Sequence, residues 1–198
     1  MSDSGTTVTD GVANPEGLDE RALESGKLAF QGEMPATSLV APRDLALAAA
    51  AAAGIYTPDK DSADEVLKRC VVVEGLTEVI EKMAIHDAGT DGAAALAEYQ
   101  DGFFDAEGNR VGTVTGTARV LAMVPHMWQY HQSRTEFDGG TFETSGVIDA
   151  TAILHGYTQV FRVVGRTGRF SGKSGFMTLT IDDPTQRPPR YRTSFAMA

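Results

Sequence analysis

From about residue 76 onward, apolar and polar residues alternate with a period of two, and β-branched and aromatic residues are frequent. This pattern is typical of β-strands that bury one face. It predicts eight strands, over residues 77–87, 96–105, 111–124, 126–137, 141–151, 157–165, 172–182 and 189–197. The connections are short and contain no crossover helices. We therefore expect residues 76–198 to form an all-β domain, an eight-stranded antiparallel up-and-down β-barrel, in which closure removes both exposed sheet edges.

The first 75 residues follow a different pattern. Residues 1–25 are polar and acidic, and a segment that buries so little apolar surface is expected to be a disordered tail. Pro42 stands where the first turn of a helix tolerates proline, and Gly54 has the character of the C-terminal cap of that helix. Ser62 has capping-box spacing to the glutamate three residues later, which predicts a second, short helix. Residues 26–75 are thus expected to be a helical segment that caps the barrel.

Strand periodicity also assigns side chains to the lumen or to the outer face. The strand 126–137 allows two assignments, because polar and aromatic residues occur on both of its faces. Arg134 and Glu136 favour solvent exposure of their own face, which places Gln129 and His131 inside. For the other strands, the lumen-facing residues are expected to be Val79, Glu81, Met83, Ile85, Tyr99, Phe103, Phe142, Thr144, Gly146, Ile148, Ala150, Tyr157, Gln159, Phe161, Val163, Met177, Leu179 and Ile181.

Glu81 stands out among these lumen positions because it carries a carboxylate. Alternation places Glu78 and Lys82 outside and Glu81 inside, where burial in an apolar lumen raises the pKa of a carboxyl group. One interpretation is an acid that hydrogen-bonds a ligand carbonyl. The alternative is a solvated position near the barrel mouth, or a pairing with an arginine. The sequence leaves both open.

Composition excludes several classes of partner. The net charge is −10, whereas binding to nucleic acid or to an anionic membrane requires a basic face. Cys70 is the one cysteine, so neither an internal disulfide nor a cysteine-based metal site is expected. The longest apolar run, residues 45–53, is too short to span a bilayer, and no signal-peptide pattern is visible. A cytoplasmic location is the simplest expectation.

The glycine-rich segment 165–175 superficially suggests nucleotide binding. Gly172-Lys173-Ser174 matches the end of a phosphate-binding loop, but Thr167 occupies the position of the required first glycine. The residues that follow alternate like a strand rather than opening a helix. We therefore expect the glycines to form a tight corner between two strands.

Motifs for metal or covalent catalysis are not apparent either. The four histidines, His86, His126, His131 and His155, show no metal-ligand spacing, and no serine lies in a Gly-x-Ser-x-Gly pattern. We therefore expect no metal and no cofactor, and any catalysis should be non-covalent.

Two stretches resemble the allene oxide cyclase-like barrel family. They are Glu-Tyr-Gln-Asp-Gly-Phe-Phe-Asp-Ala-Glu-Gly-Asn-Arg-Val-Gly at residues 98–112 and Gly-Arg-Thr-Gly-Arg-Phe-Ser-Gly-Lys-Ser-Gly-Phe at residues 165–176. The pattern is most similar to that of bacterial spirotetramate- and spirotetronate-forming cyclases, which catalyse intramolecular Diels–Alder reactions in polyketide antibiotic biosynthesis. By position, the resemblance places the family's lumen aromatic residues on Tyr99 and Phe161, a lumen tyrosine on His131, a substrate-stacking tryptophan on Leu179 and a lumen methionine on Ile181.

The resemblance implies a cofactor-independent cyclase (a pericyclase) that folds a linear polyene tetramate or tetronate within an apolar lumen. His131 and Glu81 are the candidate catalytic residues, and residues 30–40 are a candidate lid. The candidate substrate-binding residues are Met83, Tyr99, Phe103, Gln129, Tyr157, Phe161, Val163, Met177, Leu179 and Ile181. The alternatives are a hetero-Diels–Alder or other ring-forming cyclase, and a non-catalytic, lipocalin-like carrier of a hydrophobic metabolite.

A homodimer is also a possible arrangement. Five large apolar residues are expected on the outer face of the barrel, where they would form an interface: Phe104, Leu121, Met123, Trp128 and Val147.

Overall fold

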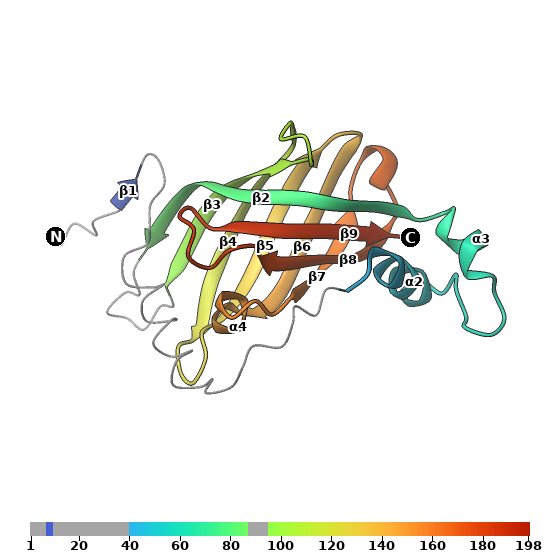
Figure 1. The fold of residues 1–198 in the computed structure, drawn as a ribbon, viewed down its shortest axis with the longest axis horizontal. Coiled ribbons are helices and arrows are strands. Elements are labelled where there is room, and N and C mark those ends of the chain that lie inside the picture. The colour runs from blue at the N-terminus through green and yellow to red at the C-terminus, as the bar shows by residue number, and fades with distance from the viewer. Residues whose placement is uncertain (1–6, 10–39, 87–94) are drawn as a thin grey trace.

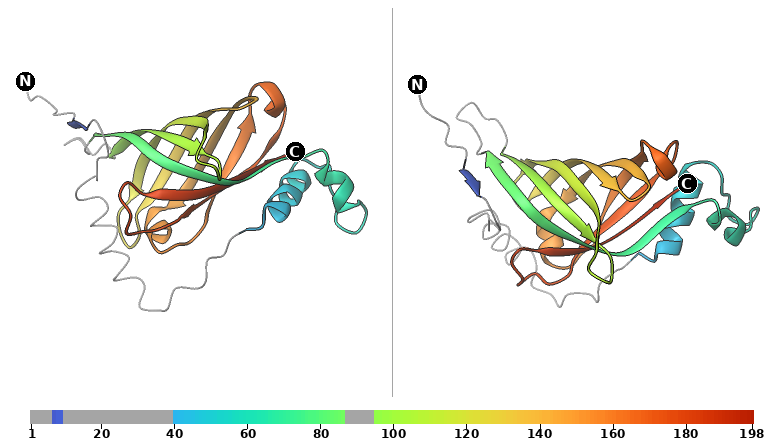
Figure 2. Two further views of the ribbon diagram at one scale, coloured as in Figure 1. Left: turned by 45° about the horizontal axis from the view of Figure 1, so that its top comes forward. Right: turned by 90° about the horizontal axis from the view of Figure 1, so that it is seen from above.

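Eight antiparallel strands form a closed barrel, as Figures 1 and 2 show. This computed structural model describes residues 7–9, 40–86 and 95–198. The strands are β2 (Val71–His86), β3 (Leu96–Phe104), β4 (Arg110–Ala122), β5 (Trp128–Phe137), β6 (Gly140–Asp149), β7 (Gln159–Gly165), β8 (Ser174–Ile181) and β9 (Arg190–Met197). Each strand pairs with the next, and β9 pairs back with β2 to close the barrel. The predicted eight-stranded barrel is confirmed, although β2 begins at Val71, within the segment 26–75 that was expected to be helical.

A further short strand lies within the segment expected to be disordered. β1 (Thr7–Thr9) pairs with Met83–Ile85 of β2, beyond the part of β2 that pairs with β9. The expectation of disorder is therefore wrong for these three residues, because the long strand β2 offers a free edge there. The rest of residues 1–25 lies outside the described residues.

Two helices precede the barrel, as predicted: α2 (Pro42–Ala52) and α3 (Ala63–Leu67). Gly54 follows α2 with φ +73°, a conformation that suits glycine at a helix end. Ser62 is the N-cap residue of α3, although its side chain makes no capping hydrogen bond. Leu45 and Ala46 of α2 pack against Ala196 on the outer face of β9.

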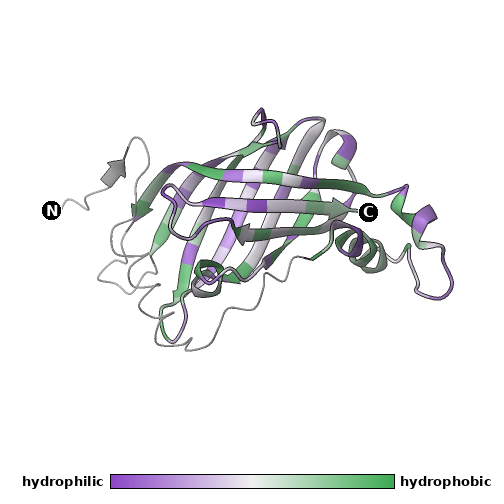
Figure 3. Cartoon of the chain, viewed as in Figure 1, coloured by the Kyte–Doolittle hydropathy of each residue, from purple (hydrophilic) through white to green (hydrophobic). Residues whose placement is uncertain are grey.

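α2 therefore lies on the barrel wall beside the C-terminal end of β9, and α3 lies beyond it (Figure 1). In Figure 3 α2 is coloured largely as hydrophobic, and its buried residues are Leu45, Ala46, Ala49 and Ala50. The expectation of a cap over the mouth is not met by α2 or α3. Residues 30–39, the candidate lid, lie outside the described residues.

Phenylalanine side chains fill one end of the barrel. We call Phe103, Phe137, Phe142, Phe170 and Phe195 the phenylalanine plug. Their rings meet edge-on or tilted, with centroids 4.7 Å apart for Phe142 and Phe195 and 5.3 Å apart for Phe142 and Phe170. Such contacts are favourable beyond simple area burial. This end is solid, so any ligand must enter from the other end.

The glycine-rich segment forms the predicted corner next to this plug. A 3₁₀ turn, η1 (Gly168–Phe170), connects β7 to β8 and delivers Phe170 into the plug. Gly168 has φ +61°, and a Cβ on Gly165 would lie only 1.7 Å from the carbonyl oxygen of Phe170. Larger residues at these positions would force the corner open.

Candidate functional site: an apolar cavity with a polar chain

A cavity occupies the barrel on the side of the plug that faces α4 (Ala150–Leu154). Its volume is about 170 Å³. An engineered apolar cavity of roughly 150 Å³ binds benzene, so this cavity has room for a small organic group. Its rim includes α4 and the prolines Pro188 and Pro189 between β8 and β9.

The sequence predicted a strand through residue 151 and missed α4. Asp149 ends β6 and caps the helix, since its Oδ1 accepts a hydrogen bond of 3.0 Å from the backbone N–H of Ala152. The missed signal is an N-capping aspartate followed by alanines, which suit a helix as well as an apolar strand does.

Most of the predicted site residues line this cavity. They are Glu81, Met83, Tyr99, Gln129, His131, Phe161, Met177 and Leu179. Four others do not line it. Phe103 belongs to the plug and Val163 packs in the same buried core, Ile181 is buried in the wall, and Tyr157 lies in the connection between α4 and β7. Periodicity placed Phe103, Val163 and Ile181 on the correct face, but it carries no information on their height along the barrel.

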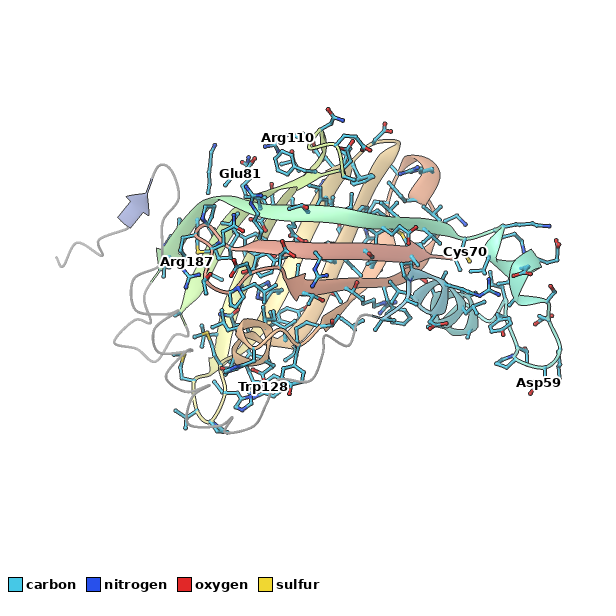
Figure 4. All side chains as sticks on the ribbon, viewed as in Figure 1. Asp59, Cys70, Glu81, Arg110, Trp128 and Arg187 are labelled. Atoms are coloured by element: carbon cyan, nitrogen blue, oxygen red, sulfur yellow. The ribbon has the colours of Figure 1, made fainter. Side chains whose placement is uncertain are left out.

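Glu81 lies at the margin of the cavity, and its carboxylate is directed to the outer face. A β-bulge between Ile80 and Lys82 inserts Glu81 as an extra residue against β3. On the outer surface Glu81 Oε1 pairs with Nη2 of Arg110, and Figure 4 shows the two side chains close together. The alternative interpretation, pairing with an arginine, is therefore the correct one, and the lumen placement of this carboxylate is wrong.

The same bulge reverses the assignment of the residues that precede it. Glu78, predicted to face solvent, is 5% exposed and lines the cavity, whereas Val79 takes the outer face. After the bulge, Met83 faces inward as predicted. One extra residue thus exchanges which glutamate is buried.

His131 forms a chain of polar contacts along one wall. Its Nε2 donates to Gln129 Oε1 at 3.0 Å, which leaves Nδ1 as an acceptor 3.5 Å from the Tyr99 hydroxyl. Burial lowers the pKa of His131 to about 4, so the imidazole is neutral near pH 7. Trp128 is 41% exposed, which confirms the predicted orientation of this strand.

Tyr99 connects this chain to the interior hydroxyls. Its hydroxyl hydrogen-bonds Ser133, whose Oγ lies 2.6 Å from Thr144 Oγ1. Burial and the nearby carboxyl groups raise the pKa of Tyr99, so it remains a hydrogen-bond donor. The ring lies directly over Gly116, where a Cβ would be 2.6 Å from the Tyr99 oxygen. Glycine at 116 is what leaves room for this tyrosine.

Apolar side chains form the opposite wall. Phe161 is 3% exposed and meets the His131 ring edge-on, with centroids 5.8 Å apart. Gly146 leaves space beside it, since a Cβ there would approach the Phe161 ring to 3.3 Å. Further apolar residues of the lining are Ile80, Ala97, Ala118, Ile148, Ile153, Met177 and Leu179.

Two buried carboxyl groups lie deeper in the cavity, and sequence reasoning missed both. Glu78 and Asp101 hydrogen-bond each other, and Thr193 Oγ1 donates to Glu78 Oε2 at 2.9 Å. Burial raises the pKa of Glu78, and burial together with the Glu78 charge raises that of Asp101 well above its ordinary value. A signal for Asp101 existed, because it shares its face of β3 with Tyr99 and Phe103.

Neither a metal-binding group of side chains nor a membrane-spanning helix is found in the described part of the chain. Residues 7–9, 40–86 and 95–198 contain no group of three or more histidine, cysteine, aspartate or glutamate side chains placed to hold a metal ion. Within the same ranges, none of the helices combines the length and apolarity needed to cross a bilayer.

The fold and the cavity together define a small β-barrel that is closed at one end and encloses a largely apolar ligand site near the other. The chain belongs to the allene oxide cyclase-like barrel family. The family model described as "Allene oxide cyclase barrel like domain" matches residues 81–196. The family inferred from the two sequence stretches is therefore confirmed.

Solved structures with the same fold include several cyclases. The Diels–Alderase AbmU from Streptomyces koyangensis is 28% identical, with a TM-score of 0.56 over 76% of this chain and 73% of that chain. A nonspecific heme-binding cyclase that catalyses [4 + 2] cycloaddition during neoabyssomicin biosynthesis is 27% identical, with a TM-score of 0.54 over 85% and 80%. AbnU, an exo-specific intermolecular Diels–Alderase, is 17% identical, with a TM-score of 0.56 over 65% and 96%, and shows the fold alone. The first two support a role as a Diels–Alder cyclase.

Proposed function

We propose that this protein catalyses an intramolecular Diels–Alder reaction of a linear polyene polyketide that carries a tetramate or tetronate head group. The observation that supports this most is the composition of the cavity, which has an apolar wall around Phe161 facing a chain of neutral hydrogen-bonding groups. The similarity to Diels–Alderases at 28% and 27% identity points to the same reaction class.

A [4 + 2] cycloaddition needs its diene and dienophile held together at near-attack distance. Fixing that geometry in a cavity lowers the barrier by up to roughly 7–11 kcal/mol. The wall around Phe161 and Leu179 confines the polyene, and the solid plug leaves it no exit at the far end. An apolar chamber that is closed at one end forces the polyene of the substrate to fold back on itself.

Tyr99 supplies the electrostatic part of the proposed mechanism. Its hydroxyl has one proton, and the contact with His131 Nδ1 is long at 3.5 Å, so a ligand carbonyl competes for that proton. Donation to a carbonyl conjugated with the dienophile stabilises the charge that develops in the transition state. His131 then acts as a positioning residue that holds Tyr99 through its neutral ring.

The reaction requires positioning and one hydrogen bond, so we infer that no cofactor takes part. The similar neoabyssomicin cyclase is described as a nonspecific heme binder, which makes the point testable. Turnover should survive dialysis against a chelator, and active protein should show no heme absorbance. Loss of turnover on dialysis, regained on adding heme or a metal ion, would contradict this inference.

The central experiment uses a linear polyene acyl tetronate or tetramate as substrate. Cyclisation is followed by mass spectrometry and the product ring by NMR, against a buffer blank. Phe161→Ala should lower the rate at least about tenfold and mix the product stereochemistry, because the templating wall is lost. Val160→Ala is the matched control, since Val160 is the neighbouring residue on β7 and is 47% exposed; it should behave as the wild type.

The alternatives are separated by the same experiment. A product with a heteroatom in the new ring indicates a hetero-Diels–Alder or another cyclase. Binding of precursor and product without rate acceleration indicates a carrier. Unchanged rate and stereochemistry in Phe161→Ala would refute templating in the lumen.

We also propose a cytoplasmic homodimer. Support comes from apolar side chains exposed on the outer wall, namely Leu121, Val124, Trp128 and Val147. Light scattering on the purified protein tests the dimer, and Trp128→Glu should yield monomers. Phe104 takes no part in the proposed interface, because Arg110 lies over its ring at 5.2 Å.

A further inference from the structure

A polar layer separates the reaction chamber from the phenylalanine plug. Along β3, the inward residues are Tyr99, then Asp101, then Phe103 of the plug. Along β5, Ser133 follows His131 in the same direction. Asp101 thus lies at the floor of the cavity, one step deeper than the tyrosine of the proposed mechanism, and that mechanism does not use it.

Two buried side-chain oxygens of this region, Asp101 Oδ1 and Thr135 Oγ1, have no hydrogen-bond partner in the described part of the chain, and of the two residues Asp101 is the one that lines the cavity. Asp101 is 5% exposed, and its Oδ1 is buried without a hydrogen-bond partner in the described part of the chain. Leaving such a group unpaired costs about 1–3 kcal/mol. Asp101 is also one of the residues that line the cavity, so a ligand group that donates to this oxygen would remove that cost.

The chemistry of the pair determines what this oxygen can bind. Two carboxyl groups hydrogen-bond each other only when one of them carries a proton. Thr193 already donates to Glu78, and burial raises the pKa of both carboxyl groups. The proton of the pair lies between the two groups, whereas Asp101 Oδ1 takes no part in their hydrogen bond and remains an acceptor.

We propose that Asp101 Oδ1 is the subsite for a hydrogen-bond donor on the substrate, an enol or other hydroxyl, or an amide N–H. This inference rests on the proposed function and deepens it by assigning an orientation. The polar head group enters first and donates to Asp101 at the floor, while the polyene folds against the apolar wall nearer the mouth. A substrate without a donor in its head group would leave Oδ1 unpaired.

The test uses two probes that differ in the donor, 4-hexylphenol and 4-hexylanisole. Their binding to the full chain is measured by calorimetry. The wild type should bind the phenol about tenfold more tightly, as one buried hydrogen bond predicts. Asp101→Leu removes the acceptor with little change of size, and the two affinities should become equal. Comparing the ratio of phenol affinity to anisole affinity between the two proteins cancels the effect of the methyl group that the anisole adds.

Two further variants sharpen the result. Asp101→Asn should retain the preference for the phenol, because its amide N–H₂ donates to Glu78 and its oxygen still accepts. Glu98→Gln, on the outer face of the same strand, should leave the wild-type ratio unchanged. The subsite would be overturned if the ratio of phenol affinity to anisole affinity were the same in the wild type and Asp101→Leu. It would also be overturned if Asp101→Asn lost the preference as Asp101→Leu does, or if neither probe bound the wild type.

Infrared spectroscopy tests the proposal without Asp101→Leu, in case that variant does not fold. The C=O stretch of the protonated carboxyl should shift to lower wavenumber when the phenol binds and should stay in place with the anisole. Its loss in Asp101→Asn assigns the band, and a band unmoved by the phenol overturns the subsite. These are binding measurements, so a protein with the phenol preference but without cycloaddition would refute only the proposed function. Cycloaddition without the preference would refute only the subsite.

Discussion

Acid should destabilise this protein through His131, and the size of the effect follows from its burial. The pKa of His131 is about 4 in the folded chain and 6.5 when unfolded. The folded state therefore binds fewer protons than the unfolded state between these values, and stability falls as the pH drops through that window. Below pH 4 both states are protonated and the loss is complete.

The full loss is about 3 kcal/mol, since one pKa unit corresponds to about 1.4 kcal/mol. About 2 kcal/mol of it is already lost at pH 5 relative to pH 7.5. The buried Glu78 and Asp101 act with the opposite sign. Their raised pKa values mean that the folded state binds more protons, so their contribution to stability decreases as the pH rises above the unfolded carboxyl range.

Because His131 and the two carboxyl groups change the stability in opposite directions as the pH falls, the assay must compare the wild type with a variant that lacks His131. Urea unfolding is measured from pH 7.5 to pH 4.5 for the wild type and for His131→Asn. The free energy of unfolding of the wild type should fall by about 2 kcal/mol more than that of the variant by pH 5. His86→Asn is the control, because His86 is exposed beside Glu98. Its pH dependence should follow the wild type.

A variant with the same pH dependence as the wild type would show that His131 is not desolvated. With its ordinary pKa near 6.5, a fraction of the imidazole would carry a proton on both nitrogens at pH 7, and that fraction could not accept from Tyr99. Such a result would contradict the buried, neutral state of His131 on which its positioning role rests.

Three other substitutions test the plug, the cavity and the outer surface of the barrel in turn. Phe170→Ala should lower the free energy of unfolding by about 3–5 kcal/mol in urea unfolding, because it empties the plug; a loss below 1 kcal/mol would mean that the plug is loosely packed. Gly116→Ala should displace Tyr99 and lower the cyclisation rate at least about tenfold, and it should also lower the free energy of unfolding, because the added Cβ would lie 2.7 Å from the Gln132 carbonyl oxygen; an unchanged rate would exclude Tyr99 as the donor. Glu81→Gln should leave turnover unchanged and alter stability by less than about 1 kcal/mol, since its partner Arg110 lies on the surface; a large loss of turnover would restore Glu81 to the site.

The barrel could be predicted from the sequence because each strand buries one face, which gives a strong period of two. The orientation of β5 also followed, since Arg134 and Glu136 cannot both be buried without partners. Within this pattern, His131 and Tyr99 were correctly placed on the lumen side. The prediction was weakest where one local irregularity changed the phase of the pattern.

The bulge at Glu81 is that irregularity. A single inserted residue reverses the facing of Glu78 and Val79, and nothing in the alternation of residues 77–87 marks it. The position of each residue along the barrel axis could not be predicted from the sequence either. Phe103 and Tyr99 share a face of β3, yet one is in the plug and the other in the cavity, because strand stagger rather than periodicity sets the height of each residue.

The arrangement of the two ends explains how the barrel tolerates a polar cavity floor. Neutral His131 and the raised pKa values of Glu78 and Asp101 reduce the cost of burying charge, but the unpaired oxygen and the lost solvation remain unfavourable. The phenylalanine plug lies directly beneath, and its burial offsets that cost. The result is a chamber with little charge inside a protein of net charge −10. A chamber of this kind suits an uncharged polyene and a concerted reaction with little charge separation, and it disfavours an anionic head group beside Glu78. We therefore expect a tetronate or tetramate to bind in its protonated enol form.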